Sequence, residues 1–173
     1  MNPKQYAIVS PNFAFQSSYN DYITELGDEE RYPMPMDLPH QNFPELIQTL
    51  YDFAAGKNLP KHLVPNSTFW LVMGDELVGV SNIRHYLSEE LAIAGGHIGI
   101  GIRPSFRKLG LGTYLLQQTI PLARELGITE IHVHCYADNQ SSVKMIEGCK
   151  GVLASNVELE GGVISRYIIE SLS

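Results

Sequence analysis

Apolar and polar residues recur along the chain with two periods, one typical of strands and one typical of helices. Alternating or continuous apolar runs predict strands at residues 5–9, 67–73, 77–87, 97–103, 129–136, 151–159 and 162–170. Apolar positions three and four residues apart predict helices at 12–26, 44–56, 110–126 and 138–148. The order is therefore β-α-α-β-β-β-α-β-α-β-β, which predicts an α/β domain built around a mixed sheet.

Capping and turn residues support these limits. Asn12 precedes the first predicted helix as an N-cap residue, and Pro44 suits the first turn of the second. Gly74 and Asp75 supply the reversal between two strands of a hairpin. Residues 27–42 are polar and rich in proline, so we expect an irregular loop between the first two helices.

The composition is that of an ordinary globular protein with a single domain, residues 1–173. Apolar residues make up 44% of the chain and charged residues 18%. No apolar run approaches the roughly 18 residues of a membrane helix, and the N-terminus lacks the apolar core of a signal peptide. We therefore expect a cytoplasmic protein with no membrane partner. The net charge of −7 argues against a nucleic-acid partner, because phosphate affinity comes mainly from Lys and Arg.

Cys135 and Cys149 are the two cysteines of the chain. Two cysteines make neither a metal-binding framework nor a dense disulfide scaffold, so we expect reduced thiols and no metal. Their spacing alone leaves a disulfide open.

Basic residues gather where the fourth predicted strand meets the third helix. Residues 91–124 contain no acid, and Arg103, Arg107 and Lys108 lie inside this window. In the segment RKLGLGT the two glycines let the backbone approach a ligand closely. A helix N-terminus adds unpaired N–H groups and a partial positive charge. These features predict a site for a phosphate-bearing ligand, with a pyrophosphate favoured.

Two common phosphate-binding motifs do not fit this junction. It lacks the Lys-Ser/Thr pair of a P-loop, which argues against nucleotide hydrolysis with magnesium. The segment GLGTYL lacks the third glycine of a dinucleotide-binding fingerprint. An α/β phosphate-binding protein of another class stays open on these residues alone.

The segment RKLGLG resembles the Arg/Gln-x-x-Gly-x-Gly/Ala signature of the GNAT superfamily of acyl-CoA-dependent N-acetyltransferases. The surroundings are similar too: a strand ending in IRP, a long amphipathic helix, the strand IHVHCY and the segment DNQSSVKMIEGCKGVL. The match covers residues 67–170 and is similar to a group of bacterial predicted acetyltransferases. The resemblance implies a GNAT-like, mostly antiparallel twisted sheet flanked by about four helices, with acetyl-CoA as the co-substrate.

The resemblance also implies which residues contact the coenzyme. The backbone of residues 100–102 would pair with the pantetheine arm like an added strand, and Gly99 and Gly101 would keep side chains out of its way, although a bulge explains these glycines as well. The amides of residues 109–113 would hold the pyrophosphate. Asn139 matches a family position that touches pantetheine, although a plain helix N-cap explains it equally well. The expected coenzyme-binding residues are Ile100, Gly101, Ile102, Arg107, Lys108, Leu109, Gly110, Leu111, Gly112, Thr113, Asn139 and Ser142.

The implied reaction is direct attack of a primary amine, on a small molecule or a peptide, on the acetyl thioester. A base takes the amine proton. The glutamate that many members carry on the strand before the signature is missing here. His97 titrates near neutral pH and is the first candidate for the base, with His134 as the alternative and His85 as a further rival.

The tyrosine that many members use as an acid is replaced by Ile146. Tyr114 and Tyr136 are near in sequence, but the pattern does not place their hydroxyls. The missing acid and glutamate leave a second function open, that of a non-catalytic acyl-CoA-binding or sensing module.

Residues 1–66 are expected to wall the acceptor site, and residues 67–170 to form the acyl-CoA-binding core. The first part carries four acidic residues close together: Asp28, Glu29, Glu30 and Asp37. They fit either a solvated loop or a surface that attracts a cationic amine. The C-terminal strands fit either a hairpin within the chain or pairing across a homodimer.

Overall fold

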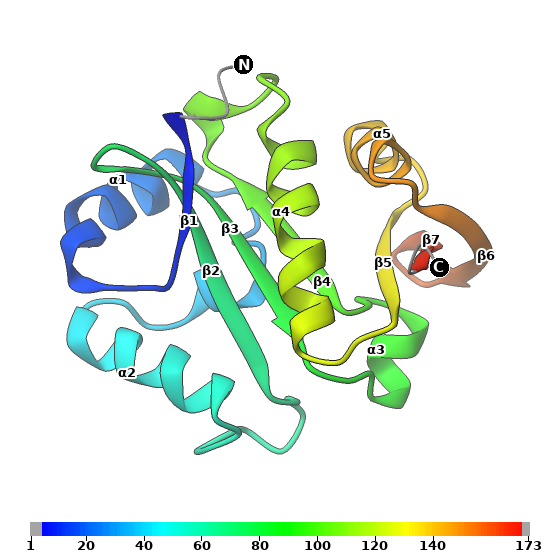
Figure 1. Ribbon diagram of the computed structural model, residues 1–173, viewed down its shortest axis with the longest axis horizontal. Helices are drawn as coiled ribbons and strands as arrows, with labels where there is room; N and C mark the ends of the chain where they lie inside the picture. Colours follow the sequence, from blue (N-terminus) through cyan, green and yellow to red (C-terminus); the bar gives the residue numbers. More distant parts are fainter. Residues whose placement is uncertain (1–4, 171–173) are drawn as a thin grey trace.

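The computed structural model describes residues 5–170 (Figure 1). Residues 1–4 and 171–173, at the two ends of the domain, lie outside the described residues. The strands are β1 (Ala7–Val9), β2 (Asn66–Met73), β3 (Glu76–Arg84), β4 (Ile98–Ile102), β5 (Glu130–Tyr136), β6 (Val152–Leu159) and β7 (Gly162–Glu170). The α-helices are α1 (Gln16–Leu26), α2 (Phe43–Ala54), α3 (Glu89–Ile93), α4 (Leu111–Glu125) and α5 (Gln140–Gly148). Short 3₁₀ helices are η2 (Phe13–Phe15), η3 (Met34–Asp37) and η4 (Pro104–Phe106).

The strands form two antiparallel sheets within the described residues. The first has the order β1-β2-β3-β4 and the second the order β5-β7-β6. Strands β4 and β5 are neighbours but do not pair along their length. Within the described residues, an isolated bridge between Gly96 and Val133 is the single β pairing that links the two sheets. Figure 1 shows β5 leaving the first sheet toward β6 and β7. The edge of β4 that faces β5 is therefore free of a strand partner.

The helices cover the two faces of the first sheet. On one face, α1 and α2 pack on β2 and β3 around a buried aromatic group that includes Tyr19, Phe43 and Trp70. On the other face, α4 packs on β3 and β4, with Leu111 and Leu115 buried among apolar strand residues. The core on both faces fixes where β4 and the N-terminus of α4 meet.

The predicted order of strands and long helices is confirmed. The mostly antiparallel sheet is confirmed as well, divided in two between β4 and β5. The helix α3 is a fifth α-helix, which the pattern did not predict because its five residues are too short to show a helical period. Ser88 caps it by accepting a hydrogen bond from the Leu91 N–H at 3.2 Å.

Asparagine side chains cap three of the four predicted helices at their N-termini. The Asn12 side chain accepts a hydrogen bond from Ala14 N–H (3.0 Å) at the start of η2, which leads directly into α1. The Asn42 side chain accepts from Glu45 N–H in α2, and the Asn139 side chain accepts from Ser142 N–H (3.1 Å) in α5. Each cap satisfies an N–H group that the first helical turn leaves unpaired.

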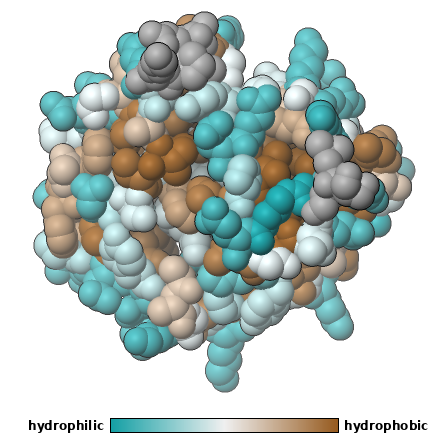
Figure 2. All heavy atoms as spheres, viewed as in Figure 1, coloured by the Kyte–Doolittle hydropathy of each residue, from teal (hydrophilic) through white to brown (hydrophobic). Residues whose placement is uncertain are grey.

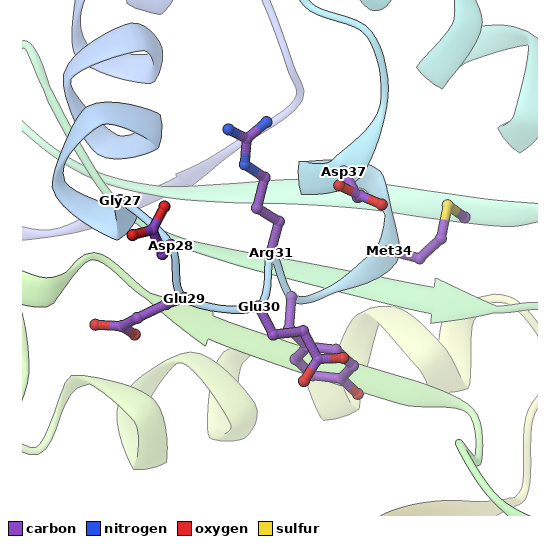
Figure 3. Close-up of a pocket in the computed structure, with 8 residues that line it drawn as sticks. Gly27, Asp28, Glu29, Glu30, Arg31, Met34 and Asp37 are labelled. Carbon is purple, nitrogen blue, oxygen red and sulfur yellow. The ribbon is translucent and has the colours of Figure 1, made fainter.

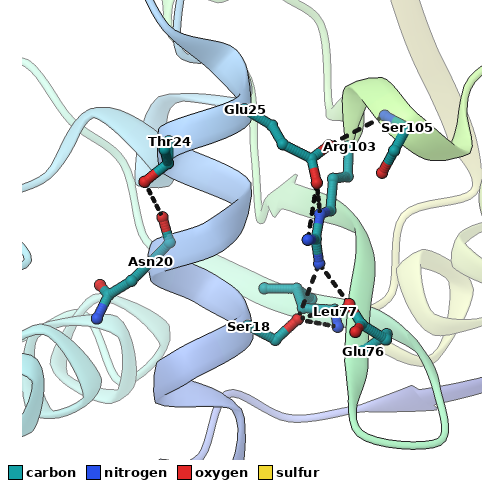
Figure 4. A network of polar contacts seen from close by, with 8 residues as sticks. All are labelled: Ser18, Asn20, Thr24, Glu25, Glu76, Leu77, Arg103 and Ser105. Atoms are coloured by element: carbon teal, nitrogen blue, oxygen red, sulfur yellow. Dashed lines mark hydrogen bonds and ion pairs between the residues drawn. The ribbon is translucent and has the colours of Figure 1, made fainter.

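Arg103 ties the end of β4 to α1 and to the β2–β3 hairpin (Figure 4). Its side chain is buried and pairs with Glu25 at 2.7 Å and Glu76 at 2.6 Å, and it also donates to Ser18 Oγ at 3.0 Å. Burial alone would raise the pKa of the Glu25 carboxyl, but hydrogen bonds from Ser105 and Arg103 hold it below its usual value. This network fixes the position at which the chain leaves β4 for the glycine-rich segment.

Candidate functional site

A cleft of about 600 Å³ opens where β4, the segment 103–110 and the first turns of α4 and α5 meet. The expected coenzyme-binding residues line this cleft, except Leu109, whose side chain is exposed to solvent. Folding also brings in residues that the sequence did not assign to the coenzyme site: Tyr22, Leu26, Glu30, Tyr32, Phe106, Ser141, Lys144 and Met145. We call this cavity the donor cleft.

The glycine-rich segment turns sharply before α4 begins. Gly110 has φ +77° and forms the N-cap of α4 without a side-chain cap, and Lys108 has φ +62°. The first backbone hydrogen bond of the helix runs from Tyr114 N–H to Gly110 O, so the N–H groups of residues 111–113 precede the hydrogen-bonded ladder. These amides and the helix dipole favour an anion at this end of the donor cleft.

The cationic residues around the signature have different partners. Arg107 donates from Nε to the Ile102 carbonyl at 3.0 Å, and its guanidinium pairs with Glu29 at 2.8 Å. Lys108 is exposed at the rim of the donor cleft, and Lys144 of α5 lines the cleft as well. Lys108 and Lys144 therefore both line the donor cleft, whereas Arg103 does not, because its side chain pairs with Glu25 and Glu76.

Gly99 and Gly101 of β4 leave room for the loop between α1 and α2. A methyl group at Gly99 would lie 2.8 Å from the Tyr32 hydroxyl oxygen and 3.0 Å from Pro33 Cβ. A methyl group at Gly101 would overlap the Tyr32 carbonyl oxygen. The sequence interpretation linked these glycines to access for pantetheine. The structure adds a second reason, the close approach of Tyr32.

The candidate histidines lie in a buried group near the gap between the sheets. The Nδ1 atom of His97 accepts a hydrogen bond from the backbone N–H of His132 at 3.0 Å. Its burial, together with the nearby His132 and Arg84, lowers the pKa of His97 to about 4. A neutral His97 with an accepting Nδ1 carries its proton on Nε2, so its one lone pair is already engaged.

His134 differs from His97 in its hydrogen bonding. Both ring nitrogens are buried, and neither has a hydrogen-bond partner within the described residues. Burial is the main cause that lowers the pKa of His134 to about 4, so the ring is neutral at pH 7 and keeps a free lone pair. The third candidate, His85, is hydrogen-bonded through Nε2 to Ser67 Oγ at 2.8 Å, and burial lowers its pKa too.

The tyrosines near the signature in sequence lie away from the donor cleft. Ile146, at the position of the usual acid, is fully buried in the core below α5. The ring of Tyr114 packs near Tyr6, with ring centres 6.0 Å apart. Tyr136 lies beside the turn between β6 and β7, where its ring approaches Gly162. Tyr32, in contrast, lines the cleft from a distant part of the chain.

A second pocket, also of about 600 Å³, lies in the loop that follows α1. Its lining residues are Gly27, Asp28, Glu29, Glu30, Arg31, Tyr32, Met34 and Asp37. Figure 3 shows the side chains of Asp28, Glu29 and Glu30 spreading outward from one turn, with Arg31 between them and Asp37. Four carboxylates against one arginine leave this acidic pocket negative. Glu30 and Tyr32 line both cavities, so the acidic pocket adjoins the donor cleft.

The split sheet, the free edge of β4 and the anion-binding turn before α4 define an α/β protein with a groove for an elongated, phosphate-bearing ligand. A family model described as the acetyltransferase (GNAT) family matches residues 23–150. The chain belongs to this family, and the expectations of an acetyltransferase with acetyl-CoA as co-substrate are confirmed.

Solved acetyltransferase structures have the same fold. The enzyme from Salmonella typhimurium that modifies the N-terminal serine of ribosomal protein L7/L12 is 14% identical, with a TM-score of 0.68 over 96% of this chain and 95% of that one. A putative acetyltransferase from Salmonella typhimurium, solved with acetyl-CoA, is 12% identical, with a TM-score of 0.65 over 96% and 94%. A mutant of the spermidine N-acetyltransferase from Vibrio cholerae is 16% identical, with a TM-score of 0.66 over 96% and 94%. No curated protein sequence matches the chain.

Among residues 5–170, no helix is long and apolar enough to cross a membrane. The same residues contain no group of three or more His, Cys, Asp or Glu side chains that could hold a metal ion.

Proposed function

We propose that this protein transfers an acetyl group from acetyl-CoA to a primary amine of a small molecule or peptide by direct attack. The observation that carries this proposal is the donor cleft, in which a free strand edge and an anion-binding helix N-terminus lie side by side. Family membership supplies the reaction class, and the neighbouring acidic pocket supplies a route for an amine.

The coenzyme would lie along the donor cleft. The amides of residues 111–113 and the side chains of Lys108, Arg107 and Lys144 would hold the pyrophosphate. The free edge of β4 at residues 100–102 would pair with the pantetheine arm. Asn139 both caps α5 and lines the cleft, so its side-chain amide N–H groups are left to contact the arm.

The acceptor would arrive through the acidic pocket, which favours a positively charged amine. Structural neighbours act on N-terminal serine of a ribosomal protein and on spermidine, by their names, and both kinds of acceptor carry an amine. We favour His134 over His97 as the base, because the lone pair of His97 already accepts a backbone hydrogen bond. Burial, with nearby cationic and imidazole groups, keeps His134 neutral at pH 7 with its lone pair free; its pKa of about 4 makes it a weak base, and it lines neither the donor cleft nor the acidic pocket, so a water would have to relay the amine proton to it.

A non-catalytic acyl-CoA-binding module is the second candidate, favoured by Ile146 at the position of the usual acid. The two functions differ in what happens to bound acetyl-CoA, which is either turned over with an amine or retained.

A cytoplasmic location and a homodimer complete the proposal. Cys135 and Cys149 are free thiols, which fits a reducing compartment. Strand β6 closes a hairpin with β7, and its other edge is unpaired within the described residues, with Val152 and Leu153 exposed. Figure 2 shows hydrophobic residues in separate patches, one of them at the side of the molecule where Figure 1 places β6. An exposed apolar edge is suited to pairing with a second copy.

Calorimetric titration with acetyl-CoA tests the donor site. Wild type is compared with Gly110→Glu, which places a carboxylate at the anion site, and with Gly127→Glu as the matched control. Both glycines have positive φ and open space beside the Cα, and they flank the two ends of α4, so strain and added charge are similar. We expect at least a tenfold loss of affinity in the first variant and little change in the second.

Release of CoA in the presence of spermidine or a peptide with N-terminal serine then tests catalysis. Amine-dependent release supports the acetyltransferase. Tight binding of acetyl-CoA without CoA release in the presence of any amine would instead favour the acyl-CoA-binding module. Equal acetyl-CoA affinity of Gly110→Glu and Gly127→Glu would show that Gly110 does not lie at the pyrophosphate site.

A further inference from the structure

Tyr32 packs across β4 at the two positions, Gly99 and Gly101, where the strand has no side chain on that face. Its hydroxyl oxygen and ring lie over Gly99, where a methyl group would be 2.8 Å from the oxygen and 3.1 Å from Cζ. Its main chain lies over Gly101, two residues along the same face of the strand. Because both neighbours lack a Cβ, the phenol is held against the backbone of β4 instead of above it.

This position coincides with the junction of the two cavities. Tyr32 and Glu30 are the residues common to the linings of the donor cleft and the acidic pocket. A catalytic role for Tyr32 depends on the proposed function. A coenzyme whose pyrophosphate lies at the N-terminus of α4 and whose arm follows β4 from Ile102 to Ile100 carries its thioester toward Gly99. From Ile102 to Gly99 the strand rises about 10 Å, so the reacting sulfur approaches the Tyr32 hydroxyl.

The Tyr32 hydroxyl is free to act on a ligand. It makes no hydrogen bond within the described residues, and Tyr32 is 38% exposed. Tyr22 also lines the donor cleft, but burial raises the pKa of its phenol above the usual range, which makes it a weaker proton donor. No tyrosine stands at the usual position of the acid, where Ile146 is buried.

We infer that Tyr32 is the proton donor to the leaving thiolate, supplied by the loop after α1 instead of by α5. The amine nitrogen forms a bond to the acetyl carbonyl carbon, and the carbon–sulfur bond breaks. The sulfur takes the proton of the Tyr32 hydroxyl, which leaves CoA as a thiol. The nitrogen loses its extra proton to the base, and the Tyr32 phenolate regains a proton from solvent. Each atom and charge is thereby accounted for.

Tyr32→Phe removes the hydroxyl and leaves the ring over Gly99. The assay follows acetyl transfer to spermidine or a peptide with N-terminal serine, whichever wild type acetylates faster, with acetyl-CoA and with its selenoester analogue as donors. A selenol is a better leaving group than a thiol and needs less protonation. We expect kcat with acetyl-CoA to fall about tenfold to a hundredfold, the KM for acetyl-CoA to stay within twofold, and the selenoester to restore most of the rate.

Two further variants sharpen the test. Gly99→Ala places a methyl group 2.8 Å from the hydroxyl oxygen, too close for the phenol to keep its position, so it should give the same selective loss, and the double variant should be no slower than either single one. Tyr136→Phe is the matched control, because Tyr136 is 49% exposed and its ring also lies beside glycines, at the turn between β6 and β7. It should behave as wild type.

The possible failures are distinct. Equal slowing of Tyr32→Phe with thioester and selenoester would mean that the residue positions the ligands, and would overturn the assignment as proton donor. An unchanged rate with acetyl-CoA would overturn it as well. If wild type binds acetyl-CoA but releases no CoA with either amine, the proposed function fails and the role of Tyr32 fails with it. This outcome is seen in wild type alone, before any variant is measured.

Discussion

Arg103 and Arg107 are four residues apart, yet the structure assigns them opposite tasks, and exchange of each for methionine should separate stability from coenzyme binding. The Arg103 side chain is buried and pairs with two carboxylates, Glu25 and Glu76. Arg107 is 42% exposed and pairs with Glu29, which is 52% exposed. Methionine keeps much of the apolar length of arginine, so the substitution removes mainly the charge and the hydrogen bonds.

The expected magnitudes follow from burial. Removing one partner of a buried ion pair costs about 3–5 kcal/mol. Glu25 and Glu76 remain partly hydrated, at 30% and 49% exposure, which places Arg103→Met near the lower end, about 3 kcal/mol. For a chain of this size that is a fall in melting temperature of about 10 °C. An ion pair this exposed contributes little to stability because solvent screens it, so Arg107→Met should melt within about 3 °C of wild type.

Thermal melting and acetyl-CoA titration of the two purified variants provide the measurement. Arg103→Met should lose stability and keep its affinity for acetyl-CoA within about threefold at a temperature where it is folded. Arg107→Met should keep its stability and lose affinity about fivefold to tenfold, more at low salt than at high salt. Equal melting temperatures of the two variants, or a greater loss of affinity in Arg103→Met, would refute the division between a structural and a ligand-facing arginine.

Two further predictions concern the histidines and the start of α4. Between pH 7.5 and pH 5 the free energy of unfolding should fall by about 2 kcal/mol for each of His97 and His134. Folding lowers the pKa of each ring from 6.5 to about 4, which favours the folded state above pH 6.5. This stabilisation is lost as the pH falls toward 4, because the unfolded chain then binds the protons more readily. Urea unfolding at each pH measures the loss, and a slope unchanged in a variant with glutamine at both positions would contradict it. Gly112→Ala should leave stability within about 1 kcal/mol, because the gain in helix propensity offsets displacement of Met145, whose Sδ would lie 3.1 Å from the new methyl. Acetyl-CoA affinity should still fall, and unchanged affinity on titration would place the methyl outside the donor cleft.

The glycine turn before α4 and the strand ahead of it could be predicted from the sequence because they are built from local backbone geometry. A glycine with positive φ at the N-cap, unpaired amides in the following turn and a strand just before it all lie within one short segment. Such features leave a signature in neighbouring positions. The same reasoning identified Asn139 as a helix cap.

The rest of the site depends on contacts between distant segments, which a single sequence does not specify. Tyr32 and Glu30 reach the donor cleft from the loop after α1, and Lys144 reaches it from α5. Arg103 is adjacent in sequence to the signature, but its side chain extends back to Glu25 and Glu76. Proximity along the chain therefore grouped three cations that the fold separates.

Gly99 and Gly101 show this limit of single-sequence prediction most clearly. The sequence and the structure give different reasons why these two positions lack a side chain. Alternate glycines in a strand indicate that something approaches its backbone closely. The family resemblance suggested the pantetheine arm, whereas the structure places Tyr32 there. The two explanations are compatible, since pantetheine would pair with the free edge of β4 while Tyr32 covers its face. From the sequence of a strand alone, glycines could make room for a ligand at its edge or for a packed segment on its face. The packing of Tyr32 and Pro33 on β4 shows that Gly99 and Gly101 make room on the face.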